Sequence, residues 1–152
     1  MKQFWTPQSV YNFLRENHKS GLLLSKTLTT GVYATENFCW NELLLNQTEL
    51  PSLAVLEHLL EVANRLQAFR DTVFEGAAIT ITSAWRSELY NKKIGGAAKS
   101  KHIYGQAADF CVHNYPPSKV QKFLTGHSGG LGSYKNFTHV DVSAKRRWVG
   151  VE

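Results

Sequence analysis

The chain has 152 residues, of which 43% are hydrophobic and 19% are charged, and its formal net charge is +5. This length suits one domain with one hydrophobic core, and the composition is that of an ordinary globular protein without low-complexity tracts or internal repeats. No apolar run approaches the roughly 20 residues of a membrane span, and residues 1–9 lack the apolar core of a secretory signal, so we expect a chain that is made in the cytoplasm.

The excess of positive charge contains one tight cluster, Lys145–Arg147. A nucleic-acid module would interleave aromatic residues with Lys and Arg along one surface, and Trp148 beside this cluster is the only hint of that pattern. A solvated basic edge explains the cluster equally well, and a basic enzyme is also attracted to the anionic polymers of a cell wall. We therefore expect no nucleic-acid partner. The two cysteines, Cys39 and Cys111, are expected to be buried free thiols.

The first 36 residues predict a helical extension that packs against the rest of the chain. Thr6 can cap a helix that begins at Pro7, since proline suits the first helical position, and Gly21 ends this helix. Residues 22–38 are expected to form a loop or short strand pieces. Thr35–Asn37 could then cap a short helical turn.

The clearest helical pattern begins at Pro51 and ends at Arg70–Asp71. Its apolar residues recur every three or four positions, which predicts one buried stripe over about five turns. They are Leu53, Leu56, Leu60, Ala63, Leu66 and Phe69. We interpret this helix as the main scaffold, without a chemical role.

After Gly76 the hydrophobic period changes to two, which predicts a strand over residues 78–82. The strand leads into Ser83–Ser87, so Arg86 should lie on a connection between this strand and a short helix over Ser87–Lys93. An arginine there can form a two-pronged bond to a carboxylate, although it could also pair with a surface acid such as Glu88.

Residues 106–112 predict a second strand, in which Asp109 shares its face with small neighbours that leave room for a metal ion. A helix is expected from Pro116 to Leu124. The four glycines within residues 126–132 are expected to make a flexible connection and a mobile rim near a cleft.

A third strand over residues 137–142 would carry His139 and Asp141 on one face. His102 and Asp109 lie seven positions apart and can converge if the chain bends between them, and His139 would complete the site. Two imidazoles and one carboxylate suit zinc, and three protein ligands leave a coordination position free for water. A single histidine is more often an ordinary polar residue, but small residues around these positions allow close backbone approach.

Several short motifs with fixed spacings occur between residues 82 and 141. They are Thr82–Ser87, Asn91, Gly95–Ala97, Ser100-x-His102-x-x-Gly105-x-Ala107-x-Asp109 and His139-x-Asp141. In these motifs the chain resembles the M15-type zinc peptidoglycan peptidases, a family of D-alanyl-D-alanine carboxypeptidases and L-alanyl-D-glutamate endopeptidases. The likeness extends over about residues 37–148 and is greatest to the short phage-type branch.

The resemblance implies a small single α+β domain over residues 1–152, with helices packed on a mostly antiparallel sheet that carries the metal, as in the hedgehog/DD-peptidase fold. It also implies that His102, Asp109 and His139 bind one Zn²⁺, and that Arg86 and Ser100 contact the substrate. A chain made in the cytoplasm would then reach the cell wall through a membrane lesion, as phage lysis proteins do, or on a virion.

The identity of the general base is a separate question. Hydrolysis at zinc needs a carboxylate that takes a proton from water, yet part of the family places this acid three residues before the last histidine, where this chain has Asn136. Asp141 is our predicted catalytic residue, although it could instead orient the imidazole of His139. The alternative candidates for the general base are another acid, His113 or His127.

The sequence thus predicts a zinc metallopeptidase that hydrolyses peptide bonds of peptidoglycan stem peptides at D-amino acids. The alternative is a catalytically weak, zinc-containing domain that binds cell-wall peptides, because the hedgehog signalling domain resembles this fold and serves as a ligand. The sequence does not choose between carboxypeptidase and endopeptidase action, and it does not predict an oligomeric state.

Overall fold

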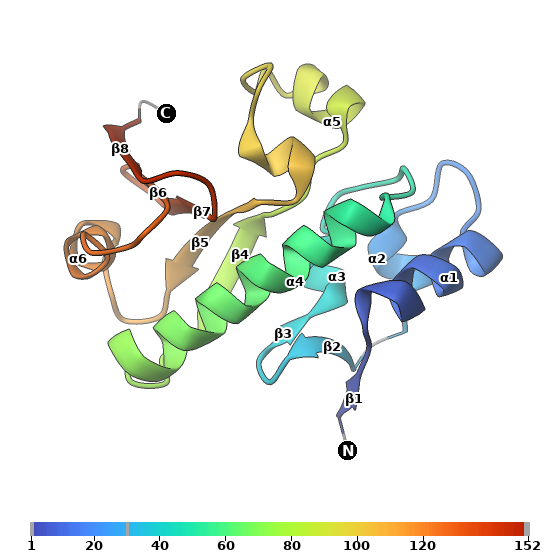
Figure 1. Ribbon diagram of the computed structural model, residues 1–152, viewed down its shortest axis with the longest axis horizontal. Helices are drawn as coiled ribbons and strands as arrows, with labels where there is room; N and C mark the ends of the chain where they lie inside the picture. The colour runs from blue at the N-terminus through green and yellow to red at the C-terminus, as the bar shows by residue number, and fades with distance from the viewer. Residues whose placement is uncertain (1, 30, 151–152) are drawn as a thin grey trace.

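The computed structural model describes residues 2–29 and 31–150, and it is an α+β structure (Figure 1). The helical elements are α1 (Pro7–Asn17), α2 (Leu24–Thr27), α3 (Trp40–Leu43), α4 (Leu53–Ala68), η1 (Phe69–Val73), α5 (Glu88–Lys93), η2 (Lys101–Tyr104) and α6 (Pro117–Phe123). The strands are β1 (Gln3–Phe4), β2 (Val32–Thr35), β3 (Phe38–Cys39), β4 (Ile79–Ser83), β5 (Ala107–Val112), β6 (Gly130–Ser133), β7 (Thr138–Asp141) and β8 (Arg146–Val149).

The larger sheet has five strands in the order β4-β5-β7-β6-β8. All of its pairings are antiparallel except the last, because β8 runs parallel to β6. A smaller sheet joins β1, β2 and β3 near the N-terminus. The expected α+β fold with a mostly antiparallel sheet is therefore confirmed.

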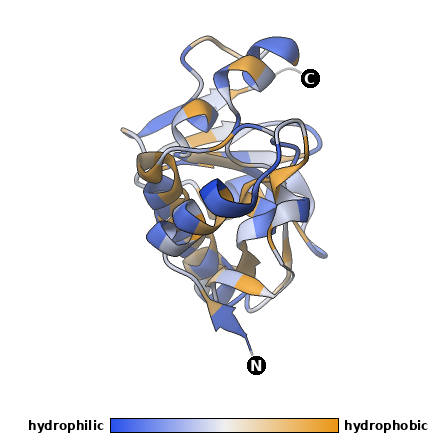
Figure 2. Ribbon diagram, turned by 90° about the vertical axis from the view of Figure 1, so that its right-hand side faces the viewer, coloured by the Kyte–Doolittle hydropathy of each residue, from blue (hydrophilic) through white to orange (hydrophobic). Residues whose placement is uncertain are grey.

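The long helix α4 crosses between the two sheets (Figure 1) and packs against α1, β2 and β5. Its hydroxyl cap is Ser52, whose Oγ accepts a hydrogen bond from the backbone N–H of Val55, so the helix begins two residues after Pro51. The residues that it buries are Leu56, Leu59, Val62, Ala63 and Leu66. Figure 2 shows hydrophobic and hydrophilic residues alternating along the helices, as expected for helices that bury one face.

The N-terminal helix begins at Pro7 as predicted, but it ends at Asn17 rather than at Gly21. The Thr6 side chain accepts a hydrogen bond from Ser9 N, and Pro7 occupies the first turn. The expected cap at Thr35–Asn37 is wrong, because Thr35 is the last residue of β2 and Glu36–Asn37 form the turn to β3. Gln67 of α4 holds that turn by accepting hydrogen bonds from Thr35 Oγ1 and Asn37 N. The helix that follows is capped by Cys39.

The glycine-rich segment is not the flexible rim that we predicted, because Gly130–Ser133 forms β6 inside the larger sheet. A side chain at Gly130 would overlap the carboxylate of Asp141, and a Cβ at Gly132 would lie 2.6 Å from the indole of Trp148. These glycines therefore serve close packing rather than flexibility.

Two smaller predictions have mixed outcomes. Cys39 and Cys111 are free thiols, but both are half-buried rather than buried. Within the described residues, no helix combines the length and the apolar character needed to cross a membrane.

Candidate metal centre

His102 is placed by a short 3-10 turn, η2, between the long helix and the sheet. The turn begins at Ser100, whose Oγ accepts a hydrogen bond from His102 N, and it ends at Gly105 in the left-handed conformation (φ 73°). A Cβ at Gly105 would lie 2.6 Å from the carbonyl oxygen of Val55 in α4. Glycine is therefore needed here for both its backbone angle and its size, and the bend turns His102 toward the sheet.

Asp109 and His139 are brought together by strand pairing. They are direct partners in the antiparallel ladder between β5 and β7, so their side chains lie on the same face of the sheet. On the opposite face, Ala108, Phe110 and Val112 belong to the hydrophobic core, as the alternation in the sequence predicted.

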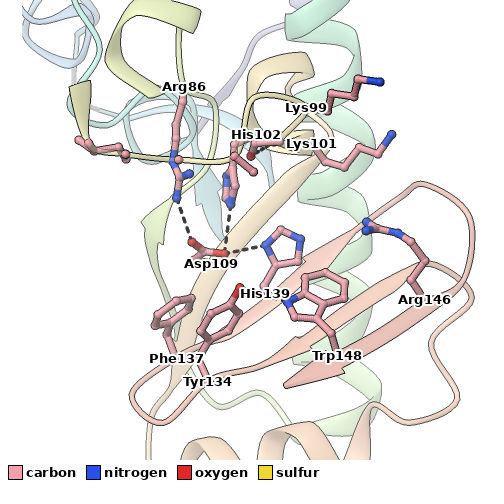
Figure 3. Close-up of a pocket in the computed structure, with 15 residues that line it drawn as sticks. Arg86, Lys99, Lys101, His102, Asp109, Tyr134, Phe137, His139, Arg146 and Trp148 are labelled. Atoms are coloured by element: carbon pink, nitrogen blue, oxygen red, sulfur yellow. Dashed lines mark hydrogen bonds and ion pairs between the residues drawn. The ribbon is translucent and has the colours of Figure 1, made fainter. Parts of the chain in front are cut away.

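One carboxylate oxygen of Asp109 lies within hydrogen-bond distance of both histidines (Figure 3). Its Oδ1 lies 3.2 Å from His102 Nε2 and 2.9 Å from His139 Nδ1. Ligand atoms bound to one tetrahedral zinc ion, at bonds of about 2.0–2.2 Å, are about 3.3 Å apart. One ligand atom from each residue can be chosen so that all three lie within 4.8 Å of one another. The three side chains thus have the spacing of a metal centre.

The remaining nitrogen of each imidazole has its own acceptor. His102 Nδ1 donates to the carbonyl oxygen of Ala84 at 2.6 Å, and His139 Nε2 donates to Asp141 Oδ2 at 2.9 Å. Acceptors at these positions favour the tautomer in which a neutral ring carries its proton on the outer nitrogen. Each inner nitrogen lies beside the Asp109 carboxylate, and in a neutral ring of this tautomer its lone pair is available to a cation at that position.

The site favours an ionised carboxylate at Asp109. Burial opposes ionisation, but the hydrogen bonds and charges of His102 and His139 outweigh it and hold the pKa of Asp109 below its usual range. Burial likewise opposes protonation of His139, but the carboxylates of Asp109 and Asp141 raise its pKa. A cation between these side chains would take the place of such a proton.

Arg86 contacts the centre from the other side of Asp109. Its Nη2 lies 3.3 Å from Asp109 Oδ2, its Nε donates to Ser83 Oγ, and its Nη1 donates to Asn91 Oδ1. The buried Asn91 also donates to the carbonyl oxygen of Ala97. Arg86 is thus fixed by three neighbours, and it pairs with Asp109 rather than with the surface acid Glu88.

A cavity of about 480 Å³ opens over the three side chains. Its lining includes Arg86 and Ser100, the two residues that the family resemblance assigns to substrate contact. Four basic residues, Arg86, Lys99, Lys101 and Arg146, stand around it, and Tyr134, Phe137 and Trp148 form an aromatic wall. In the described chain, Asp109 is the only carboxylate in its lining, so the cavity suits an anionic ligand.

Asp141 lies behind His139 and outside the lining of this cavity. Its side chain is 0% exposed and accepts hydrogen bonds from Gly130 N, Ser143 Oγ and Arg146 Nη2 in addition to His139. Burial opposes its ionisation, but these partners lower its pKa.

The two alternative histidines also lie away from the cavity lining. His127 is buried behind Asp141 and donates through Nε2 to the Asp141 carbonyl oxygen, whereas His113 is exposed just after β5.

Sequence reasoning did not identify the residues that β8 and its neighbours add to the site. Arg146 and Trp148 reach the cavity because β8 pairs with β6, and Tyr134 and Phe137 come from the turn between β6 and β7. The sequence contains one indication of this arrangement, because Arg146 and Trp148 are two positions apart and would lie on the same face of a strand. From the sequence alone, these residues look only like a basic edge.

The structure is an α+β domain in which two histidines and one aspartate form a cluster with the spacing of metal ligands. Residues 36–141 match the family described as Peptidase M15, so the chain belongs to this family. The resemblance that the motifs indicate is thereby confirmed.

Three curated relatives are similar over part of their length. The peptidoglycan L,D-endopeptidase MepK of Escherichia coli K12 is 36% identical over 78 residues, which cover 46% of this chain and 43% of the relative. The probable peptidoglycan L,D-endopeptidase MepK of Haemophilus influenzae is 36% identical over 83 residues, which cover 49% of this chain and 45% of the relative. The zinc D-Ala-D-Ala carboxypeptidase of Streptomyces albus G is 29% identical over 90 residues, which cover 55% of this chain and 35% of the relative. The similarity covers less than half the length of each relative.

Proposed function

We propose that the protein is a zinc-dependent metallopeptidase that hydrolyses peptide bonds in peptidoglycan stem peptides. The observation that carries this proposal is the convergence of two imidazole nitrogens and one carboxylate in a cavity lined with basic groups. Membership of the Peptidase M15 family supports it, as do the activities for which the relatives are named.

His102, Asp109 and His139 would hold one zinc ion, through Nε2, the carboxylate and Nδ1 respectively. Zinc would supply Lewis acidity and a water molecule of lowered pKa. The protein would supply the rest: Ala84 and Asp141 hold the two rings in place, and the basic wall draws in a substrate that carries carboxylates.

We propose that Arg86 serves the centre in two ways. Its bond to Asp109 Oδ2 keeps that oxygen turned away from the histidines and so directs Oδ1 toward the metal position. Its place in the cavity lining allows it to contact a substrate carbonyl or carboxylate, the role implied by the family resemblance. Ser100 would contribute through the η2 turn that it caps.

The general base is the predicted role of Asp141. Its burial behind His139 and its bond to Nε2 support the other role considered, in which it orients the imidazole. A base must come within hydrogen-bond reach of the proton that it takes, and Asp141 lies outside the cavity lining.

One observation favours a second function. In the described chain, the cavity lining contains no carboxylate other than Asp109, and neither His113 nor His127 belongs to it. A domain that holds zinc and binds wall peptides with little turnover is therefore the second candidate.

Digestion of purified peptidoglycan by the zinc-loaded protein, followed by mass spectrometry of the fragments, separates the two candidates. We expect cleaved stem peptides, loss of cleavage after chelation and recovery on adding zinc. Unchanged turnover after metal removal would contradict the metallopeptidase. Peptide binding without turnover, with zinc present, would favour the binding domain.

A further inference from the structure

The basic residues around the cavity differ in how firmly they are held. Lys99 is exposed and Lys101 is half-buried, and both have long flexible side chains. Arg86 is the opposite case, because three neighbours hold its guanidinium and its side chain is only 15% exposed. Arg86 therefore has little freedom to follow a substrate.

Arg146 is both held in place and accessible. Its Nη2 lies 2.7 Å from Asp141 Oδ2, yet its side chain is 47% exposed and lines the cavity. Figure 3 shows Arg146 and Arg86 on opposite sides of Asp109 and His139. The Asp141 bond uses one edge of the guanidinium, so its other donors can serve a ligand.

Trp148 supports Arg146 from the same strand. The guanidinium carbon lies 4.9 Å from the centre of the indole ring, within the range of a cation–π contact. The indole is itself fixed, since its Nε1 donates to Tyr134 Oη at 3.1 Å and its ring lies against Gly132, where a Cβ would overlap it. The ring centroids of Trp148 and His139 are 5.0 Å apart, so this pair stands next to the metal position.

We propose that Arg146 and Trp148 form a substrate subsite that binds a carboxylate next to the scissile bond. The proposal rests on the proposed function and adds to it a residue that sets substrate specificity. A guanidinium that is anchored at one nitrogen and stacked on an indole loses little freedom when it binds a carboxylate. Arg146 and Trp148 lie beyond residues 36–141, the part of the chain that matches the family.

The test compares two synthetic peptides that differ in one group. Both contain L-Ala-γ-D-Glu-L-Lys, and the D-Glu carries a free α-carboxylate in one peptide and an α-carboxamide in the other. We expect the zinc-loaded wild-type protein to cleave the acid with a kcat/KM at least about tenfold above that of the amide, as for a hydrogen bond between charged groups. Arg146→Gln should reduce this ratio to about one.

Lys145→Gln is the matched control, because it removes the same charge from the neighbouring exposed residue. It should leave the preference for the acid unchanged. The ratio of the two substrates cancels any loss of rate that Arg146→Gln causes through Asp141. Calorimetric binding of the product peptides γ-D-Glu-L-Lys, acid and amide, to the zinc-loaded proteins should show the same difference without turnover.

Equal cleavage of both peptides by the wild-type protein would overturn the proposal, as would a preference that persists in Arg146→Gln. If Arg146→Gln does not fold, Arg146→Lys replaces it, because lysine keeps the charge but not the planar fork. The preference should then fall at least about threefold, and an unchanged ratio would overturn the proposal. If the wild-type protein cleaves neither peptide and binds both product peptides equally, the subsite proposal is wrong. The proposed function is tested separately, by digestion of whole peptidoglycan.

Discussion

His139 Nε2 lies 2.9 Å from Oδ2 of the buried Asp141, two residues further along the same strand. This bond turns the other nitrogen of His139, Nδ1, toward Asp109. The pair therefore decides which nitrogen of His139 faces the metal position. Carboxylates that accept from a ligand imidazole in this way fix its tautomer and raise its affinity for metal.

Asp141→Asn tests the role of this pair. If Asp141 orients His139, the variant should bind zinc about 10- to 100-fold more weakly, and most of the rate should return at saturating zinc. A competition titration with a zinc indicator and a rate measurement in excess zinc check both parts. An unchanged zinc affinity with a rate reduced a hundredfold or more would instead identify Asp141 as the base. Glu61→Gln, on the exposed side of α4, controls for the lost charge.

Replacing any one of His102, Asp109 and His139 with alanine should abolish stoichiometric zinc binding and peptidase activity, because two ligands hold zinc far more weakly than three. Metal analysis after dialysis checks the first effect and peptide cleavage the second. His113→Ala is the matched control, since this exposed histidine lies outside the cavity lining. A single ligand variant that keeps its zinc would remove that residue from the centre.

Gly130→Ala should destabilise the fold, because the added methyl group would overlap the Asp141 carboxylate in a buried strand. Overpacking of this kind costs about 1–3 kcal/mol of unfolding free energy. Urea denaturation of the variant measures it. Gly126→Ala is the control, since a Cβ at Gly126 would have no atom within 4 Å, and it should change stability by less than about 0.5 kcal/mol. Equal stabilities of the two variants would contradict the packing role of Gly130.

Asn91→Ala should weaken substrate use while zinc stays bound. Asn91 links Arg86 to the loop at Ala97, so its loss frees both from their present positions in the cavity wall. We expect kcat/KM to fall about tenfold, in proportion to one lost hydrogen bond to a charged group. Steady-state kinetics and metal analysis measure the two quantities, and Asn64→Ala, exposed on α4, serves as the control. A variant with wild-type kinetics would show that Arg86 does not need this neighbour.

The parts of the fold that local chemistry determines could be predicted from the sequence. Thr6 and Pro7 specify the start of α1, and the period of two places Asp109 on one face of β5 and both His139 and Asp141 on one face of β7. The alternation along the strands and the bend at Gly105 together bring His102, Asp109 and His139, the predicted metal ligands, close to one another.

The errors have a common physical origin in contacts between distant segments. Gly130 and Gly132 look like a flexible linker until Asp141 and Trp148 are packed against them. Arg146 likewise looks like a surface charge, because its place beside the centre depends on parallel pairing of β8 with β6. Such pairings leave little trace in local sequence.

The most direct test of the central claim is crystallographic. Diffraction data from zinc-loaded crystals, collected on both sides of the zinc absorption edge, locate the ion without reference to activity. We predict one anomalous peak bounded by His102 Nε2, the Asp109 carboxylate and His139 Nδ1. A peak elsewhere, or none at this position in excess zinc, would contradict the account.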